Sequence, residues 1–141
     1  MTLQAVRSFY EAPIISAFDQ LDVKLILDNM LYDDNDAATE FGTMMLMFNQ
    51  STAVAITCPP EDLRGLIVIE VYVPKGQGPG RCQRILTEVM TALQTLNDPL
   101  YKTDTVYGSV GRVSGPTFKQ LKKEPYFAGR LSVPFKARYT G

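Results

Sequence analysis

The segment from Leu63 to Gly78, LRGLIVIEVYVPKGQG, most strongly constrains how this chain can fold. From Ile67 to Val73 every second residue is apolar and β-branched: Ile67, Ile69, Val71 and Val73. A period of two with side chains of this kind predicts a β-strand that turns one face into a core. Pro74 then removes an amide donor, and three glycines follow before a helical pattern begins. The predicted order is strand, glycine-rich turn, helix.

The glycine-rich turn at positions 76–80 allows two interpretations from its own residues. Glycines let the backbone approach an anion at a helix N-terminus, which would make the turn a phosphate-binding loop. The nucleotide-binding patterns GxxxxGK[ST] and GxGxxG are not met, because Lys75 precedes the glycines and Arg81-Cys82 follow Gly80. An ordinary strand-to-helix connection, with Pro79 near the first helical position, is the alternative.

Two further segments have helical periodicity. The first contains Leu3, Val6, Tyr10, Ile14, Ala17, Phe18 and Leu21, and it is expected to bend at Pro13. The second contains Cys82, Ile85, Leu86, Val89, Leu93 and Leu96. Each predicts an amphipathic helix that packs through one face.

Four more segments have strand character. Val23–Leu27 is a short apolar run, and Thr103–Val113 alternates imperfectly. Gly42–Ile56 is apolar without alternation at Met44–Phe48, which predicts a strand covered on both faces or an adaptable methionine-rich binding surface. One of the two covers could be another subunit. The last strand alternates apolar and basic residues, and Pro134 places it at an edge, at a bulge, or where pairing is one-sided. The sequence therefore predicts an α+β fold with a mixed, mostly antiparallel sheet, an N-terminal helix and a second helix packed on it.

The charges are unevenly distributed along the 141 residues, although the net charge is −1. Met1–Asp62 carry −8, Leu63–Leu100 carry +1 and Tyr101–Gly141 carry +6. Complementary patches of this kind could orient neighbouring copies, unless folding interleaves the two signs. The acids cluster in Tyr32–Glu40, which does not match a calcium loop, and the bases in Ser114–Pro125, which predicts a mobile basic loop.

The LRGLIVIEVYVPKGQG segment, with Leu27-Asp28-Asn29 before it and LSVPFKA near the C-terminus, resembles a family of bacteriophage proteins. These are the tail terminators, or tail-completion proteins, of long-tailed phages. The resemblance runs along the chain, which is expected to form one domain over residues 1–141. It does not extend to residues 30–62 or 114–125, where loops that contact partners would lie.

The resemblance implies a structural virion protein rather than an enzyme. It implies a ring of six copies at the head-proximal end of the tail tube, which ends tube polymerisation and offers a surface to the head connector. The partners are then other copies, the tail tube protein and the head-tail connector protein, while DNA only passes through the channel. The protein would be assembled in the host cytoplasm and reside in the neck of the virion. A head-tail joining or head-closure protein of the same neck is the alternative.

Candidate interface residues are the charged ones of the two clusters and of the segments beside them. They are Asp33, Asp34, Asp36, Arg81, Arg84, Arg112, Lys119, Lys122 and Lys123. Exposed charges steer association and are screened by salt. We therefore expect them to line surfaces used between subunits or towards the tube and connector.

An enzyme has little support in the sequence. Histidine is absent, and neither a Gly-x-Ser-x-Gly motif nor a CxxC pair is present. Asp28, Glu70 and Glu88 would serve as carboxylate catalysts only if folding brought two of them together. No cofactor and no metal are expected. A nucleic-acid binder is disfavoured by a pI near 5.4 and by the lack of a recognised motif. No run of 18 apolar residues and no signal-peptide pattern occur, so neither a membrane nor secretion is expected.

Overall fold

The computed structural model describes residues 2–27, 40–53, 61–74, 80–98, 106–120 and 126–139. These residues form two helices and six strands. In chain order the elements are α1 (Thr2–Gln20), β1 (Lys24–Ile26), β2 (Phe41–Ala53), β3 (Glu61–Pro74), α2 (Gly80–Thr95), β4 (Val106–Val110), β5 (Ser114–Gln120) and β6 (Tyr126–Tyr139). The glycine-rich turn up to residue 79 lies outside the described residues.

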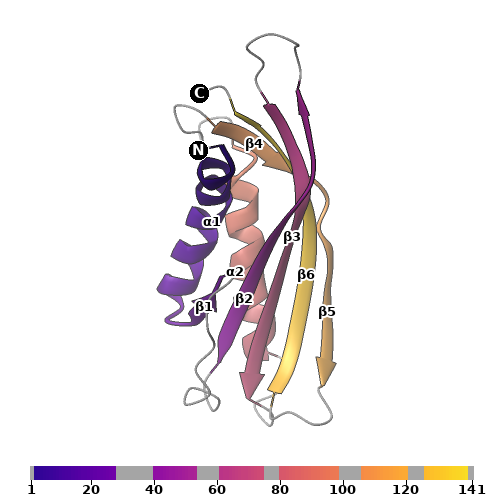
Figure 1. Cartoon of the computed structure of the whole chain (residues 1–141). Helices are drawn as coiled ribbons and strands as arrows, with labels where there is room; N and C mark the ends of the chain where they lie inside the picture. The colour runs from indigo at the N-terminus through magenta and orange to yellow at the C-terminus, as the bar shows by residue number, and fades with distance from the viewer. Residues whose placement is uncertain are drawn as a thin grey trace.

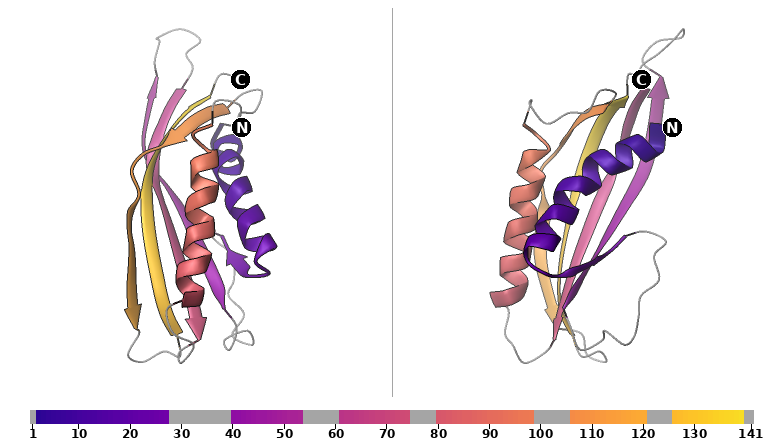
Figure 2. Two further views of the ribbon diagram at one scale, coloured as in Figure 1. Left: turned by 180° about the vertical axis from the view of Figure 1, so that it is seen from behind. Right: turned by 90° about the vertical axis from the view of Figure 1, so that its left-hand side faces the viewer.

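The six strands form one twisted sheet, and both helices lie on the same face of it (Figures 1 and 2). The strand order is β1-β2-β3-β6-β4, and β5 also pairs with β6. Only β1 and β2 run parallel to each other, whereas the other pairs are antiparallel. The α+β fold expected from the sequence is thus confirmed, as is the packing of both helices on a mixed, mostly antiparallel sheet.

The core lies between the helices and the sheet. The four alternating residues of β3, from Ile67 to Val73, are fully buried, and so are Ile85 and Val89 of α2. From β6, Leu131, Val133, Phe135 and Ala137 point into the same layer. Each large apolar side chain contributes about 1.5 to 3 kcal/mol when it is buried, so this layer provides most of the stability of the fold.

The N-terminal helix continues through Pro13 as one element. Its apolar side packs on the sheet, with Val6, Tyr10, Ile14 and Phe18 fully buried. The Tyr10 hydroxyl donates to the main-chain oxygen of Lys136 at 2.8 Å, and it also lies 3.1 Å from that of Ser109. A buried tyrosine normally needs such a partner. Tyr10 therefore connects the helix to the β4–β6 pair.

The segment Ser114–Pro125 was expected to be a mobile loop, and this expectation is wrong for residues 114–120. These residues form β5, which pairs with β6 from Ser132 to Phe127. The register shifts between Ser114 and Thr117, where Gly115 has a φ of +96°. A bulge accommodates the Gly-Pro dipeptide that gave the segment its turn-like sequence. Residues 121–125 lie outside the described residues.

Pro134 occupies the place in β6 where the pairing on one side changes from β5 to β4. Pro134 is opposite Leu66 of β3. Along β6, the pairing with β5 ends at Ser132 and the pairing with β4 starts at Phe135. The Pro134 carbonyl accepts a hydrogen bond from Gly111 N at 2.8 Å. The expectation of one-sided pairing near Pro134 is confirmed, and the alternative of an edge strand is wrong because β6 is central. A proline is tolerated here because its missing donor falls at the gap.

Neither described helix is long and apolar enough to cross a membrane.

Candidate interaction surfaces

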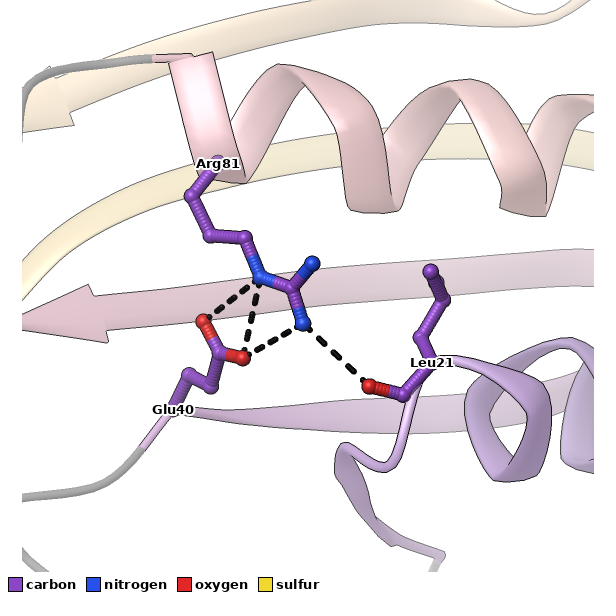
Figure 3. Close-up of polar contacts among 3 residues, drawn as sticks. All are labelled: Leu21, Glu40 and Arg81. Atoms are coloured by element: carbon purple, nitrogen blue, oxygen red, sulfur yellow. Dashed lines mark hydrogen bonds and ion pairs between the residues drawn. The ribbon is translucent and has the colours of Figure 1, made fainter.

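Arg81 connects three elements at one end of the molecule (Figure 3). Its Nε donates to the two carboxylate oxygens of Glu40 at 2.9 and 3.0 Å, and its Nη2 lies 2.7 Å from Oε1. The same Nη2 donates to the carbonyl of Leu21 at 3.2 Å. The hydrogen bonds with Glu40 raise the pKa of Arg81. The second residue of α2 thereby holds the residue before β2 and the turn after α1 in place.

This contact gives Arg81 a role within the chain that the sequence did not indicate. Arg81 and Glu40 are 41 residues apart, and Glu40 stood in the sequence as the last acid of a cluster. No local spacing could have paired them. A bidentate pair fixes geometry as well as charge. A further role of Arg81 towards a partner stays a prediction.

The other predicted interface residues that the structure describes come from three different segments. Arg84 is exposed on α2, and Arg112 is exposed in the connection between β4 and β5. Lys119 belongs to β5, opposite Ala128 of β6. Asp33, Asp34, Asp36, Lys122 and Lys123 lie outside the described residues. Their role as interface residues is still a prediction.

The face of the sheet away from the helices carries an apolar patch. Met45 of β2 is opposite Val68 of β3, and Met47 is opposite Leu66, which in turn is opposite Pro134 of β6. Met45 and Met47 are 49% and 38% exposed. We call these five residues the outer patch; Val68, at 5% exposure, is its buried member. Among the described residues the helices cover only the side of Met44 and Leu46, so cover of the other face by another subunit stays a prediction.

Basic side chains surround the outer patch. Exposed bases on this face come from four strand positions: Lys24, Arg64, Arg130 and Lys136. Arg64 is opposite Lys136, and Arg130 is opposite Glu70. Glu70 is half-buried and accepts a hydrogen bond from the Tyr72 hydroxyl at 2.6 Å. The described part of the outer face is thus mainly positive.

The helix layer carries the opposite charge and a groove. Exposed acids on the helices and in the turns that end them are Asp19, Asp22, Glu88 and Asp98, with Arg84 as the exposed base. A groove of about 400 Å³ runs between the helices. It is lined mainly by small side chains, among them Ala12, Ser16, Ala17, Thr91 and Ala92, with Glu88 at its side. The exposed charges of the described residues thus separate by layer, basic on the sheet and acidic on the helices. They do not separate by sequence half, because Lys24 lies on the basic face although it comes from the acidic N-terminal part.

The sheet also presents two edges. On one side, β1 pairs with only the first three residues of β2, from Phe41 to Thr43. Farther along β2, Arg7 donates to the carbonyl of Leu46 at 3.4 Å, and the same guanidinium pairs with Glu11 at 3.3 Å. On the other side, β5 pairs with β6 alone among the described strands. Edge strands can bind a further strand from a neighbour.

The groups with reactive or perturbed chemistry are dispersed. Glu70 lies on the outer face of the sheet and Glu88 on the helix layer, so these two candidate catalysts do not meet, and Asp28 lies outside the described residues. Burial raises the pKa of the Cys82 thiol to about 11 and that of Tyr10 well above its ordinary value. Among the described residues, no three metal-binding side chains gather. The features that stand out are surfaces.

Neither a protein-family model nor a curated protein matches the sequence. Among solved protein structures, 31 chains match. One of these, whose name states no function, superposes with a TM-score of 0.65 over 99% of this chain and 97% of its own, at 15% identity. A match at this identity supports the fold, and function must be argued from the surfaces.

Proposed function

We propose that this protein is a ring-forming structural subunit of the phage tail terminator type. In this role, copies assemble into a ring on the head-proximal end of the tail tube. The ring ends polymerisation of the tube and provides the attachment surface for the head connector. The partners are further copies of this chain, the tail tube protein and the connector protein.

The observation that carries this proposal is the difference between the two layers of the domain. One layer exposes methionines among basic side chains, and the other exposes acids beside a groove. Monomeric proteins rarely expose large contiguous apolar patches, and such patches mark interaction sites. Two different surfaces on one subunit favour a heterologous contact, which closes into a ring when its rotation completes a turn.

The sequence motifs supply the link to the phage neck. The strand that contains Val71-Tyr72-Val73-Pro74 and the strand that contains Val133-Pro134-Phe135 lie side by side in the centre of the sheet. The segments that carry the family resemblance are therefore the structural centre of the domain. A head-closure protein of the same neck would share such a centre, so position in the particle separates the two functions.

The test is a mass measurement of the purified protein by light scattering, alone and with tail tubes. We expect a ring of six copies, either free or bound at one end of each tube, and an end to tube growth when the protein is added. Electron microscopy of capped tubes then locates it. A chain that stays monomeric at high concentration and leaves tube length unchanged would refute the proposal. Binding to connectors but not to tubes would favour the head-closure alternative.

A further inference from the structure

No described segment covers Met45 and Met47 of the outer patch, and the composition of the patch suits burial against protein. Met45 and Met47 are among the few large apolar side chains that the described residues expose. Leu66 and Pro134 continue the patch across β3 and β6. Methionine is unbranched and flexible, so it fits irregular surfaces well. A patch of this kind at the centre of a sheet face would gain by contacting an apolar surface of matching shape.

The groove between α1 and α2 provides such a shape on the opposite side of the molecule. Its lining includes Ala12, Ala17 and Ala92, whose short side chains leave room for longer ones. Figure 2 shows the two helices side by side on one face of the sheet. The outer patch lies on the other face, because the side chains that alternate with it in β2 and β3 are buried under the helices. Because the two surfaces face in opposite directions on one chain, they can meet only between different copies.

The charges around the two surfaces are complementary. Arg64, Arg130 and Lys136 are exposed around the outer patch. Glu88 lines the groove and Asp19 is exposed on α1, while Arg84, one turn before Glu88, is the exposed base of α2. The exposed acids of the described helix layer outnumber this base. Opposite potentials orient two proteins before contact and disfavour contacts between like surfaces. Two outer faces would repel each other, as would two helix layers, whereas an outer face and a helix layer attract.

We propose that the outer patch of one copy docks on the α1–α2 groove of the next, with Met45 and Met47 seated between the two helices. This inference rests on the proposed ring and specifies its contact. The interface is heterologous, so each copy uses its sheet face towards one neighbour and its helices towards the other. The occupant of the outer patch is therefore a second copy of this chain.

Cross-linking tests the contact directly. In a Cys58→Ser background we combine Met47→Cys with Thr91→Cys, two exposed positions, and treat assembled protein with a short bismaleimide. The double variant should give a ladder of covalent oligomers on a denaturing gel, while each single variant should not. Dimers from Met47→Cys alone would show two sheet faces in contact and would overturn the proposal. Rings of the double variant that give no ladder would overturn it as well.

A charge exchange provides an independent test. Variant A carries Arg64→Glu, Arg130→Glu and Lys136→Glu, and variant B carries Asp19→Lys and Glu88→Lys. At low salt each variant alone should need at least about tenfold more protein to assemble, because its two surfaces now have the same sign. An equimolar mixture should recover rings in which A and B alternate. If the mixture assembles no better than either variant, or stops at dimers, the proposed contact is wrong.

The two tests separate this inference from the proposed function. Rings that cap tubes but neither cross-link nor respond to the exchange would leave the function intact and refute the contact. Cross-linked ladders from a protein that ignores tail tubes would support the contact and refute the function. Circular dichroism of every variant checks the fold, and Gln83→Lys/Thr87→Lys, on exposed positions of α2 that do not line the groove, is the matched control.

Discussion

Arg81 holds Glu40 through both carboxylate oxygens, with contacts between 2.7 and 3.0 Å, although 41 residues separate them. The side chains are 29% and 24% exposed, so the pair is only partly screened by solvent. Arg81 also reaches the carbonyl of Leu21, which follows α1. One guanidinium thus ties the start of α2 to the start of β2 and the end of α1.

Loss of this pair should destabilise the domain moderately. We expect Arg81→Ala to lower the free energy of unfolding by about 1 to 2 kcal/mol, between the values for exposed and buried pairs. Glu40→Gln should cost less, and the double variant should cost less than the sum of the two. Urea denaturation of all four proteins gives the coupling energy. Arg81→Lys is the control, because lysine keeps the charge but lacks the bidentate geometry. Strict additivity would mean that the pair contributes nothing as a pair.

A methyl group at Gly65 should be far more damaging than one at Gly80. A Cβ at Gly65 would overlap the main-chain oxygen of Met47 and approach the Phe135 ring, while one at Gly80 meets nothing within 4 Å. The main chain of a paired strand cannot shift without losing hydrogen bonds and packing, so the overlap would cost stability. We expect Gly65→Ala to lower the free energy of unfolding by more than about 2 kcal/mol and Gly80→Ala to leave it within about 1 kcal/mol. Thermal melts of the two variants, compared with the wild type, decide this. Similar melting temperatures for both would contradict the close approach at β2 and β3.

The two faces of the sheet should respond differently to a new charge. Val71 is fully buried opposite Gly129, so Val71→Asp would place an unpaired carboxylate in the core. We expect it to abolish cooperative unfolding or to cost more than about 4 kcal/mol. Met45→Asp, on the exposed face of β2, should cost less than about 1 kcal/mol. Circular dichroism during urea titration distinguishes them, and a folded Val71→Asp protein would be incompatible with the observed core.

The buried thiol of Cys82 should make stability fall in alkali. Burial raises its pKa from 9.0 to about 11 in the folded chain, so the unfolded chain releases this proton first. The contribution of the neutral thiol to the free energy of unfolding is therefore complete below pH 9. It is lost as the pH rises from 9 through 11, by up to about 3 kcal/mol. Unfolding in urea at pH 8 and pH 10.5 measures the loss. Cys82→Ala, which lacks the titrating group, should show a shallower fall over the same range, and an equal fall would assign the effect to other groups.

The elements that could be predicted from the sequence are those with a local signal. In β3 and α2 the apolar period alone identified the buried side chains, because each strand or helix turns one face to the core. The period could not show that Met45 and Met47 remain exposed, since a run without alternation fits either one or two covered faces. Only the position of both helices on one side of the sheet decides that.

The rest depended on contacts between distant segments. The dipeptide Gly115-Pro116 has the composition of a turn, yet pairing with β6 makes it a bulge in a strand. Pro134 correctly indicated an interruption of pairing, but the sequence could not distinguish an edge strand, a bulge and one-sided pairing. The gap between the partners β4 and β5 shows that the pairing is one-sided. The sequence also did not reveal that charge separates by layer. Lys24 lies among acidic residues in the sequence but belongs to the mainly basic outer face of the sheet, and Glu88 belongs to the mainly acidic helix layer.

The last prediction concerns the lysines of the segment that follows the bulge in β5. We expect the triple variant Lys119→Glu, Lys122→Glu and Lys123→Glu to fold normally but to form rings or cap tubes more slowly at low salt. Exposed charges of this kind steer association, and each pair contributes only about 0 to 1 kcal/mol, so salt should narrow the difference from the wild type. Under the proposed function, a phage that carries this variant should have overlong tails or unjoined heads. Assembly kinetics by light scattering at two salt concentrations test this, with the matched Lys→Gln triple variant to separate lost charge from reversed charge. If the glutamate variant caps tubes at the wild-type rate in low salt, these lysines face neither a neighbouring copy nor the tube.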